Sequence, residues 1–190
     1  MNQAIRRSPG RPGSDASREV LLDAAYWQTI ERGYAAVTPD SIANAAGAGK
    51  QTLYRWLPGK AAIVLDALAQ KARARIDRPM DAAIRAGDVL AFLRAAFAAL
   101  TTTGPALRCL LAEGQGDPDI LDGFRRHFVE PRCDGLRRVL EHRIISPTER
   151  DTLVEAIDGA IWRRMLLGGK LDNDFATALA ALVPRDSKIR

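Results

Sequence analysis

Within six consecutive residues stand Lys50, Gln51, Thr52 and Arg55, whose side chains can all donate hydrogen bonds. Lysine and arginine pair with phosphates, and a glutamine can bond both polar edges of an adenine in the major groove of DNA. This chemistry requires the four side chains to lie on the outer side of one helix. The stretch therefore predicts a surface that reads nucleic acid.

The small and apolar residues around this stretch predict how it is held. Ala43, Gly47 and Leu53 stand four and six residues apart. Two helices that cross steeply at a tight turn need a small residue at the close approach, a residue tolerant of positive φ in the turn, and an apolar residue on the second helix. The spacing predicts a helix-turn-helix motif. Taken alone, it also fits a helical hairpin whose basic residues are merely solvated.

Capping and breaking residues predict the elements around the motif. Thr38 followed by Pro39 is a helix start, and a glycine or proline ends each neighbouring helix. Three helices are predicted in residues 14–59: one from Ser14 or Asp15 to Arg32, one from Pro39 to before Gly47, and one through Trp56.

The remaining residues, 60–190, also read as helical, with Pro131 as a kink in one long helix. The first predicted spans are 60–78, ended by Pro79, then 87–100 and a short helix ending at 113, with a break at Gly104-Pro105 between them. The others are 120–143, 147–167 after a start at Ser146-Pro147, and 172–183 with Asp172 as its cap. We expect an all-α protein of about nine helices: an N-terminal three-helix helix-turn-helix domain followed by a larger C-terminal helical domain. The predicted divisions are a flexible basic arm at 1–13, a DNA-binding domain at 14–59 and the second helical domain at 60–190.

Composition limits the class of protein. The 190 residues are 47% hydrophobic and 27% charged, which is typical of a globular protein, and the net charge is +5. Arg11 belongs to an acid-free N-terminal arm, which fits either a segment that follows a phosphate backbone or a solubilising tail. The two cysteines lack metal-ligand spacing, so no metal and no cofactor are expected. No apolar run reaches the roughly 18 residues of a membrane span, and no secretory signal is evident, so we expect a cytoplasmic protein.

The stretch from Arg18 to Lys60 resembles the DNA-binding domain of the TetR family of bacterial regulators. The matching pieces are Arg18-Glu19, Leu22-Asp23-Ala24-Ala25, Glu31-Arg32-Gly33-Tyr34, Thr38, Ile42-Ala43, Ala46-Gly47 and Thr52-Leu53-Tyr54-Arg55-Trp56-Leu57-Pro58-Gly59-Lys60. The resemblance implies that Lys50, Gln51 and Thr52 meet base edges or phosphates. It also implies that Thr38, Tyr54, Arg55 and Lys60 hold phosphates.

This sequence departs from the family pattern at three places. Gly49 stands where a capping serine or threonine is common, and Leu57 stands where phenylalanine is common. Gln28-Thr29 replaces an apolar pair, which predicts a locally repacked domain core with help from Trp27 or Ile30.

Resemblance in the C-terminal half is carried by residues 128–140 and 166–175. It implies a homodimer in which the last two long helices pair with their symmetry mates. The residues predicted at that interface are Ile157, Ile161, Met165, Phe175 and Leu179. The alternative is that these side chains form an intramolecular core.

The family also implies that residues 60–190 form a ligand-binding and dimerisation domain with a small-molecule cavity among its middle helices. The predicted lining is Phe92, Phe97, Leu107, Leu111, Phe128 and Trp162. We expect a repressor that a small hydrophobic effector releases from a near-palindromic double-stranded operator. The alternative is a DNA-binding protein with no inducer that has an architectural or positioning role, and a cavity filled by side chains would favour it.

An enzyme is not expected. His127 and His142 occur without an HExxH, a CxxC or a glycine-rich phosphate loop. His127 and Cys133 could form a nucleophile pair, but six residues on a proline-interrupted helix do not reliably share a face.

Overall fold

The computed structural model describes residues 12–49, 51, 53–54, 59–114, 116–143 and 146–184. Within these ranges all regular structure is helical, as the sequence predicts. The chain forms two compact units, residues 1–67 and 68–190, and the division falls within the helix α4 (Lys60–Ala86). The arm at 1–11, with Arg11, lies outside the described residues, as do Lys50, Thr52 and residues 55–58.

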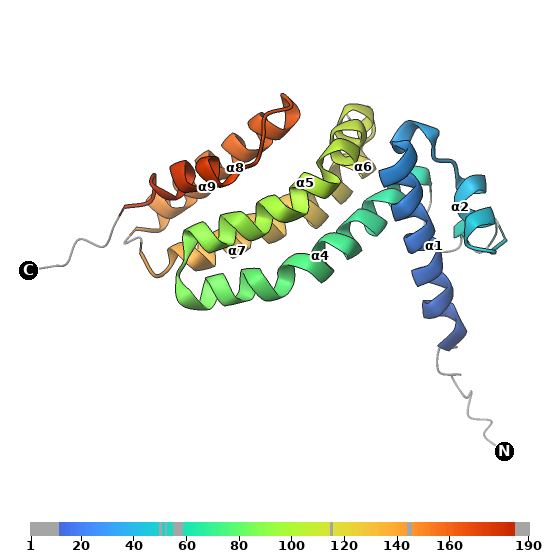
Figure 1. Cartoon of the computed structure of the whole chain (residues 1–190), viewed down its shortest axis with the longest axis horizontal. Helices are drawn as coiled ribbons and strands as arrows, with labels where there is room; N and C mark the ends of the chain where they lie inside the picture. Colours follow the sequence, from blue (N-terminus) through green and yellow to red (C-terminus); the bar gives the residue numbers. More distant parts are fainter. Residues whose placement is uncertain are drawn as a thin grey trace, which may run out of the picture. The chain divides into compact units, whose positions relative to one another are not determined.

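The first unit is built on α1 (Pro12–Arg32), which contacts η1 (Tyr34–Ala36) and α2 (Pro39–Ala45) (Figure 1). The predicted start of α2 is confirmed: the Thr38 hydroxyl accepts the Ser41 N–H at 3.1 Å, and the Ser41 hydroxyl accepts the Thr38 N–H at 3.0 Å. This reciprocal capping box satisfies two backbone donors that the helix start would otherwise leave unpaired.

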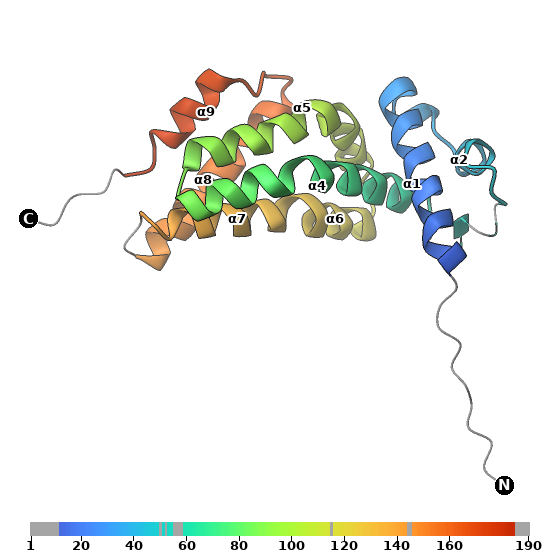
Figure 2. The same ribbon diagram turned by 60° about the horizontal axis from the view of Figure 1, so that its bottom comes forward.

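The second unit is a bundle centred on α5 (Val89–Gly114), which contacts α6, α7, α8 and α9 (Figures 1 and 2). Its other elements are α6 (Pro118–Phe124), the π-helical segment η2 (Arg125–Val129), α7 (Glu130–Leu140), α8 (Pro147–Leu166) and α9 (Asn173–Ala180). The 24 residues Val89–Ala112 are long and apolar enough to cross a membrane, so the expectation of no such run is wrong. More than half of this segment is buried, because neighbouring helices cover α5.

Two prolines that were predicted to end helices lie inside them instead. Pro79 is within α4 and Pro105 within α5, so the predicted breaks at these two positions are wrong. Each proline removes one backbone hydrogen bond, but both face solvent, where water can bond the freed carbonyl. The residues that follow on the inner face, such as Met80 and Leu107, are buried and favour continuing the helix.

The predicted interruption near Pro131 is confirmed. The five residues of η2 form a π-helix directly before α7, in which Pro131 is the second residue. A π-turn shifts the hydrogen-bond register and so accommodates the missing proline donor.

A buried ion pair joins α7 to α8. Arg132 and Asp158 are 7% and 9% exposed, and Arg132 donates from Nε to Asp158 Oδ1 at 2.7 Å and again from Nη2. The Trp162 ring covers the guanidinium at 4.7 Å. Burial, followed by the negative charge of Asp158, raises the pKa of the neighbouring Cys133 thiol to about 11. Cys133 is therefore protonated at neutral pH, which disfavours its use as a nucleophile.

We expect Asp158→Ala to lower the free energy of unfolding by about 3–5 kcal/mol, because Arg132 would remain buried without its counter-ion. Asp151→Ala is the matched control, since it removes the exposed partner of Arg137 at 2.9 Å and should cost about 0–1 kcal/mol. Urea denaturation followed by circular dichroism measures both. Equal losses for the two variants would show that the buried pair contributes no more to the free energy of unfolding than the exposed pair does.

Candidate nucleic-acid interface and ligand cavity

The turn after α2 has the geometry that the spacing predicts. Gly47 has φ of 61°, and its N–H donates to the carbonyl of Asn44 while Ala48 N–H donates to the carbonyl of Ala43 at 2.9 Å. This is the Schellman pattern that a residue with positive φ completes. Ala43 and Leu53 are 2% and 1% exposed, so the small and apolar positions face the core as expected.

The polar pair that departs from the family pattern is buried and hydrogen-bonded. Gln28 donates from Nε2 to the carbonyl of Ser41 at 2.9 Å and accepts the Ser41 hydroxyl at 2.7 Å. Thr29 donates to the carbonyl of Ala25 at 2.7 Å. The repacking is therefore polar and fixes the start of α2 against α1. Trp27 is 52% exposed and does not fill the core, so its predicted packing role is wrong.

The predicted DNA-contacting residues within the described part of the first unit lie at its surface. Thr38, Gln51 and Tyr54 are exposed, and the Thr38 hydroxyl, which accepts the Ser41 N–H, can still donate its own proton. Lys60 is half-buried, with Nζ 4.0 Å from the centre of the Tyr34 ring, and it begins α4. In the same unit, Arg18 of α1 forms an ion pair with Asp66 of α4.

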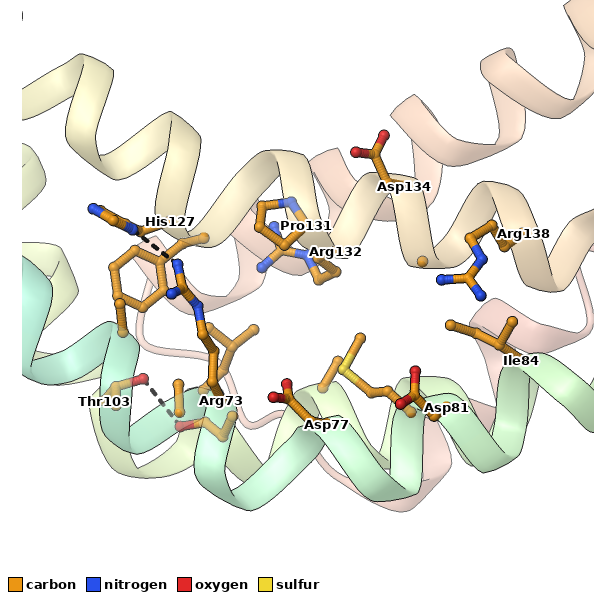
Figure 3. A pocket seen from close by; sticks show the side chains of 18 residues that line it. Arg73, Asp77, Asp81, Ile84, Thr103, His127, Pro131, Arg132, Asp134 and Arg138 are labelled. Atoms are coloured by element: carbon orange, nitrogen blue, oxygen red, sulfur yellow. Dashed lines mark hydrogen bonds between the residues drawn. The ribbon is translucent and has the colours of Figure 1, made fainter.

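A cavity of about 200 Å³ lies in the second unit among α4, α5, η2 and α7 (Figure 3). Its floor is buried and apolar and includes four alanines with Met80, Leu100 and Phe128. Its mouth carries ionised side chains of both signs from α4 and α7: Arg73, Asp77, Asp81, Asp134 and Arg138. The expected purely apolar lining is therefore wrong at the mouth.

Only one of the six residues predicted to line a cavity, Phe128, lines this one. Phe92, Phe97 and Leu107 are buried in the core, where the ring of Phe92 fills the space beside Gly135. Trp162 packs on Phe124 at 4.8 Å, and Leu111 is half-buried on α5.

The sequence interpretation missed Asp77, Met80 and Asp81 as lining residues because it ended this helix at Arg78 and took charged residues as solvated faces. Their spacing of three or four residues, which places them on one helix face with Arg73 and Ile84, was the available signal.

Four of the five predicted dimer residues are core residues of one chain. Ile157, Ile161, Met165 and Leu179 are 0–5% exposed. Side chains with almost no exposed surface have nothing left to bury against a partner, so the assignment of these four to the interface is corrected. Phe175 is half-buried against Phe97 at 5.7 Å, and its place at the interface stays a prediction. The exposed side of α8 instead includes Thr152, Glu155, Ala156, Gly159, Arg163 and Leu166.

Two protein-family models match the chain. One, described as bacterial regulatory proteins of the tetR family, matches residues 21–67, and the other, a tetracyclin repressor-like C-terminal domain, matches residues 79–183. The chain belongs to the TetR family. It is therefore a DNA-binding transcriptional regulator, and because the family is one of regulators, the expectation that the chain is not an enzyme is confirmed.

Relatives and solved structures agree with this membership. The chain is 31% identical to the uncharacterised HTH-type transcriptional regulator YdeS of Bacillus subtilis, over 87% of this chain and 86% of that protein. It is 27% identical to the DNA-binding transcriptional repressor TetR of Mycobacteroides abscessus, over 82% and 85%. The crystal structure of the TetR-family regulator SCO0332 superposes with a TM-score of 0.71 at 29% identity, over 87% of this chain and 94% of that one.

We expect Gly47→Ala to destabilise the protein by about 1–2 kcal/mol, because an added Cβ disfavours positive φ. No atom lies within 4 Å of the position where that Cβ would stand, so the cost comes from the backbone and not from a clash.

Gly49→Ala is the matched control. Gly49 has equally open space and no positive φ, so its replacement should change the free energy of unfolding by less than about 0.5 kcal/mol. If urea denaturation gave the same midpoint for both variants, the conformation assigned to the turn would be incorrect.

Proposed function

We propose that this TetR-family regulator is a cytoplasmic homodimeric repressor that reads a near-palindromic operator and is released from it by a small effector. The observation that carries the proposal is the pairing of a helix-turn-helix unit with an unfilled cavity in the helical unit. The cavity favours this function over that of a positioning protein with no inducer, whose middle helices would be filled by side chains.

The DNA contacts follow from the surface of the first unit. Gln51 reads a base edge from the first turn of the predicted third helix, which ends at Trp56 and serves as the recognition helix, with Lys50 and Thr52 beside it. Thr38, Tyr54, Arg55 and Lys60 bind phosphates around it, and Arg11 follows the backbone from the N-terminal arm. The stacking of Lys60 on Tyr34 holds its ammonium at the start of α4, which supports a phosphate contact of fixed position.

The dimer forms through the exposed face of α8 and the residues after α9. Ala156, Gly159, Arg163 and Leu166 recur every three or four residues, so they share one side of the helix. A Cβ added at Gly159 would meet no atom within 4 Å, and small residues allow a partner helix to approach closely. Leu167 and Leu182, 73% and 55% exposed, add apolar surface for burial.

The effector acts through α4, which starts in the DNA-binding unit and lines the cavity with residues between Ala69 and Ile84. An effector shifts operator affinity only by its differential affinity for the DNA-competent and DNA-incompetent dimers. The coupling expected in such a system is about 1–3 kcal/mol.

Selection from a random duplex library tests the DNA-reading role. The parent protein should enrich a near-palindrome, and Gln51→Ala should lose preference at one position in each half-site, with about 1–3 kcal/mol less discrimination. Glu31→Ala, a change at an exposed residue of α1, should return the parental motif. The same motif from all three proteins would make Gln51 a backbone contact, and no enriched motif from the parent would contradict sequence-specific binding.

A charge placed on the exposed face of α8 tests the dimer. Leu166→Glu should give a monomer in light scattering, because burying an unpaired carboxylate in an apolar interface is costly. Leu121→Glu makes the same change at an exposed leucine of α6 and should leave the dimer intact. A dimer that survives Leu166→Glu would place the interface on another surface.

A further inference from the structure

Three ionised side chains line the cavity without a hydrogen bond or ion pair to any described residue. They are Asp77 and Asp81 on α4 and Arg138 on α7, and they point into the space between the two helices (Figure 3). Asp77 and Asp81 are one helical turn apart, so their like charges repel each other. Both walls of the cavity mouth therefore present charge that the described part of the protein leaves unmatched.

The other ionised residues of the lining already have partners. Arg73 donates to Nδ1 of His127 at 3.0 Å, which directs its guanidinium toward one end of the cavity. Asp134 accepts from Arg137 at 2.8 Å, and Arg132 is held by Asp158. The ionised groups without a partner among the described residues are thus an acidic pair on one wall and the Arg138 guanidinium on the other. Arg73, whose partner is an uncharged imidazole nitrogen, keeps its positive charge at one end of the cavity.

The floor has the opposite character. Ala72, Ala96, Ala99, Leu100 and Phe128 line it, and each is less than 10% exposed. An apolar group inserted there gains from leaving water, whereas an ionised group would lose its hydration. The volume of about 200 Å³ is below the roughly 300–1,000 Å³ of pockets for drug-sized ligands, so the occupant is small.

We propose that the cavity binds a small zwitterion, with an ammonium between Asp77 and Asp81, a carboxylate on Arg138 and an apolar group on the alanine-rich floor. A purely cationic ligand would leave Arg138 unmatched, and a purely anionic one would leave the acidic pair unmatched. A zwitterion complements both walls at once. The inference that the zwitterion is the effector rests on the proposed function. The inference that the cavity binds a zwitterion can be tested without DNA.

Four probes with the same aromatic body and different heads separate the possibilities. They are phenylalanine, the cation 2-phenylethylammonium, the anion 3-phenylpropionate and the neutral 2-phenylethanol, each titrated into the full-length protein by calorimetry. Phenylalanine should bind at least about tenfold more tightly than each of the other three, because it alone matches both walls.

Charge variants test which wall of the cavity binds the ammonium and which binds the carboxylate. Asp77→Asn with Asp81→Asn should weaken phenylalanine and 2-phenylethylammonium by about tenfold and leave 3-phenylpropionate unchanged. Arg138→Gln should weaken phenylalanine and 3-phenylpropionate and leave the cation unchanged. Asp119→Asn, at an exposed acid of α6 outside the cavity, is the control and should change none of them. Circular dichroism of each variant confirms that it folds.

Three results would overturn the proposal. The cation or the anion could bind as tightly as phenylalanine, all four probes could fail to bind, or phenylalanine could bind with no response to the charge variants. DNA binding measured on the same preparations keeps this outcome separate from the proposed function. Loss of ligand binding with intact DNA binding would reject the zwitterion alone, whereas absence of DNA binding in the parent would reject the regulator function.

Discussion

The buried contact between Arg132 and Asp158 is the constraint on which the second unit depends. The two residues are only 7% and 9% exposed, and a guanidinium and a carboxylate buried to this degree are tolerated only when they satisfy each other. Their pairing fixes α7 to α8, and Trp162, one turn after Asp158, closes over the guanidinium. Because Arg132 also lines the cavity, the cavity wall and α8 are joined by a contact that cannot be broken cheaply. A ligand that displaces this wall must therefore displace α8 as well.

A buried polar contact also fixes two helices of the first unit to each other. Gln28 is buried on α1 and holds the start of α2 through two hydrogen bonds to Ser41. Ser41 in turn completes the capping box with Thr38, one of the proposed phosphate contacts. A polar side chain in the core thus sets the position of an exposed one. An apolar pair at Gln28 and Thr29 would pack the helices but would not fix α2 by directional bonds.

Local signals in the sequence predict the parts of the fold that local chemistry decides. Thr38, Ser146 and Asp172 cap helices as expected, since each side chain accepts a backbone N–H within three residues. Gly47 takes positive φ because the turn directly after α2 requires it, which is also a local effect. The breaks predicted at Pro79 and Pro105 are wrong because burial of the opposite helix face outweighs one lost hydrogen bond, and that burial is a tertiary effect. Local spacing also predicts the helix-turn-helix motif correctly, because Leu53 is buried and Gln51 is exposed as expected.

The cavity and the faces of α8 could not be read from the sequence. Ile157 and Ile161 are apolar at helical spacing, which predicts a buried face but not whether a neighbour in the same chain or a partner buries it. The exposed stripe at Ala156 and Gly159 carries a weaker signal, because small residues are common on any helix. In the cavity, the charges of Asp77 and Arg138 become informative only when the opposite wall is known.

The central claim is that two chains read two half-sites together, and changing the spacing between the half-sites tests it most directly. The selected operator would be compared, by fluorescence anisotropy, with the same sequence carrying an insertion of about five base pairs, half a helical turn, at its centre. Because the recognition helices of one dimer must reach major grooves roughly 34–36 Å apart on one face of the duplex, a half-turn insertion should reduce the affinity to that of a single half-site. Unchanged affinity for the lengthened duplex would show that the chains bind independently and would contradict the account.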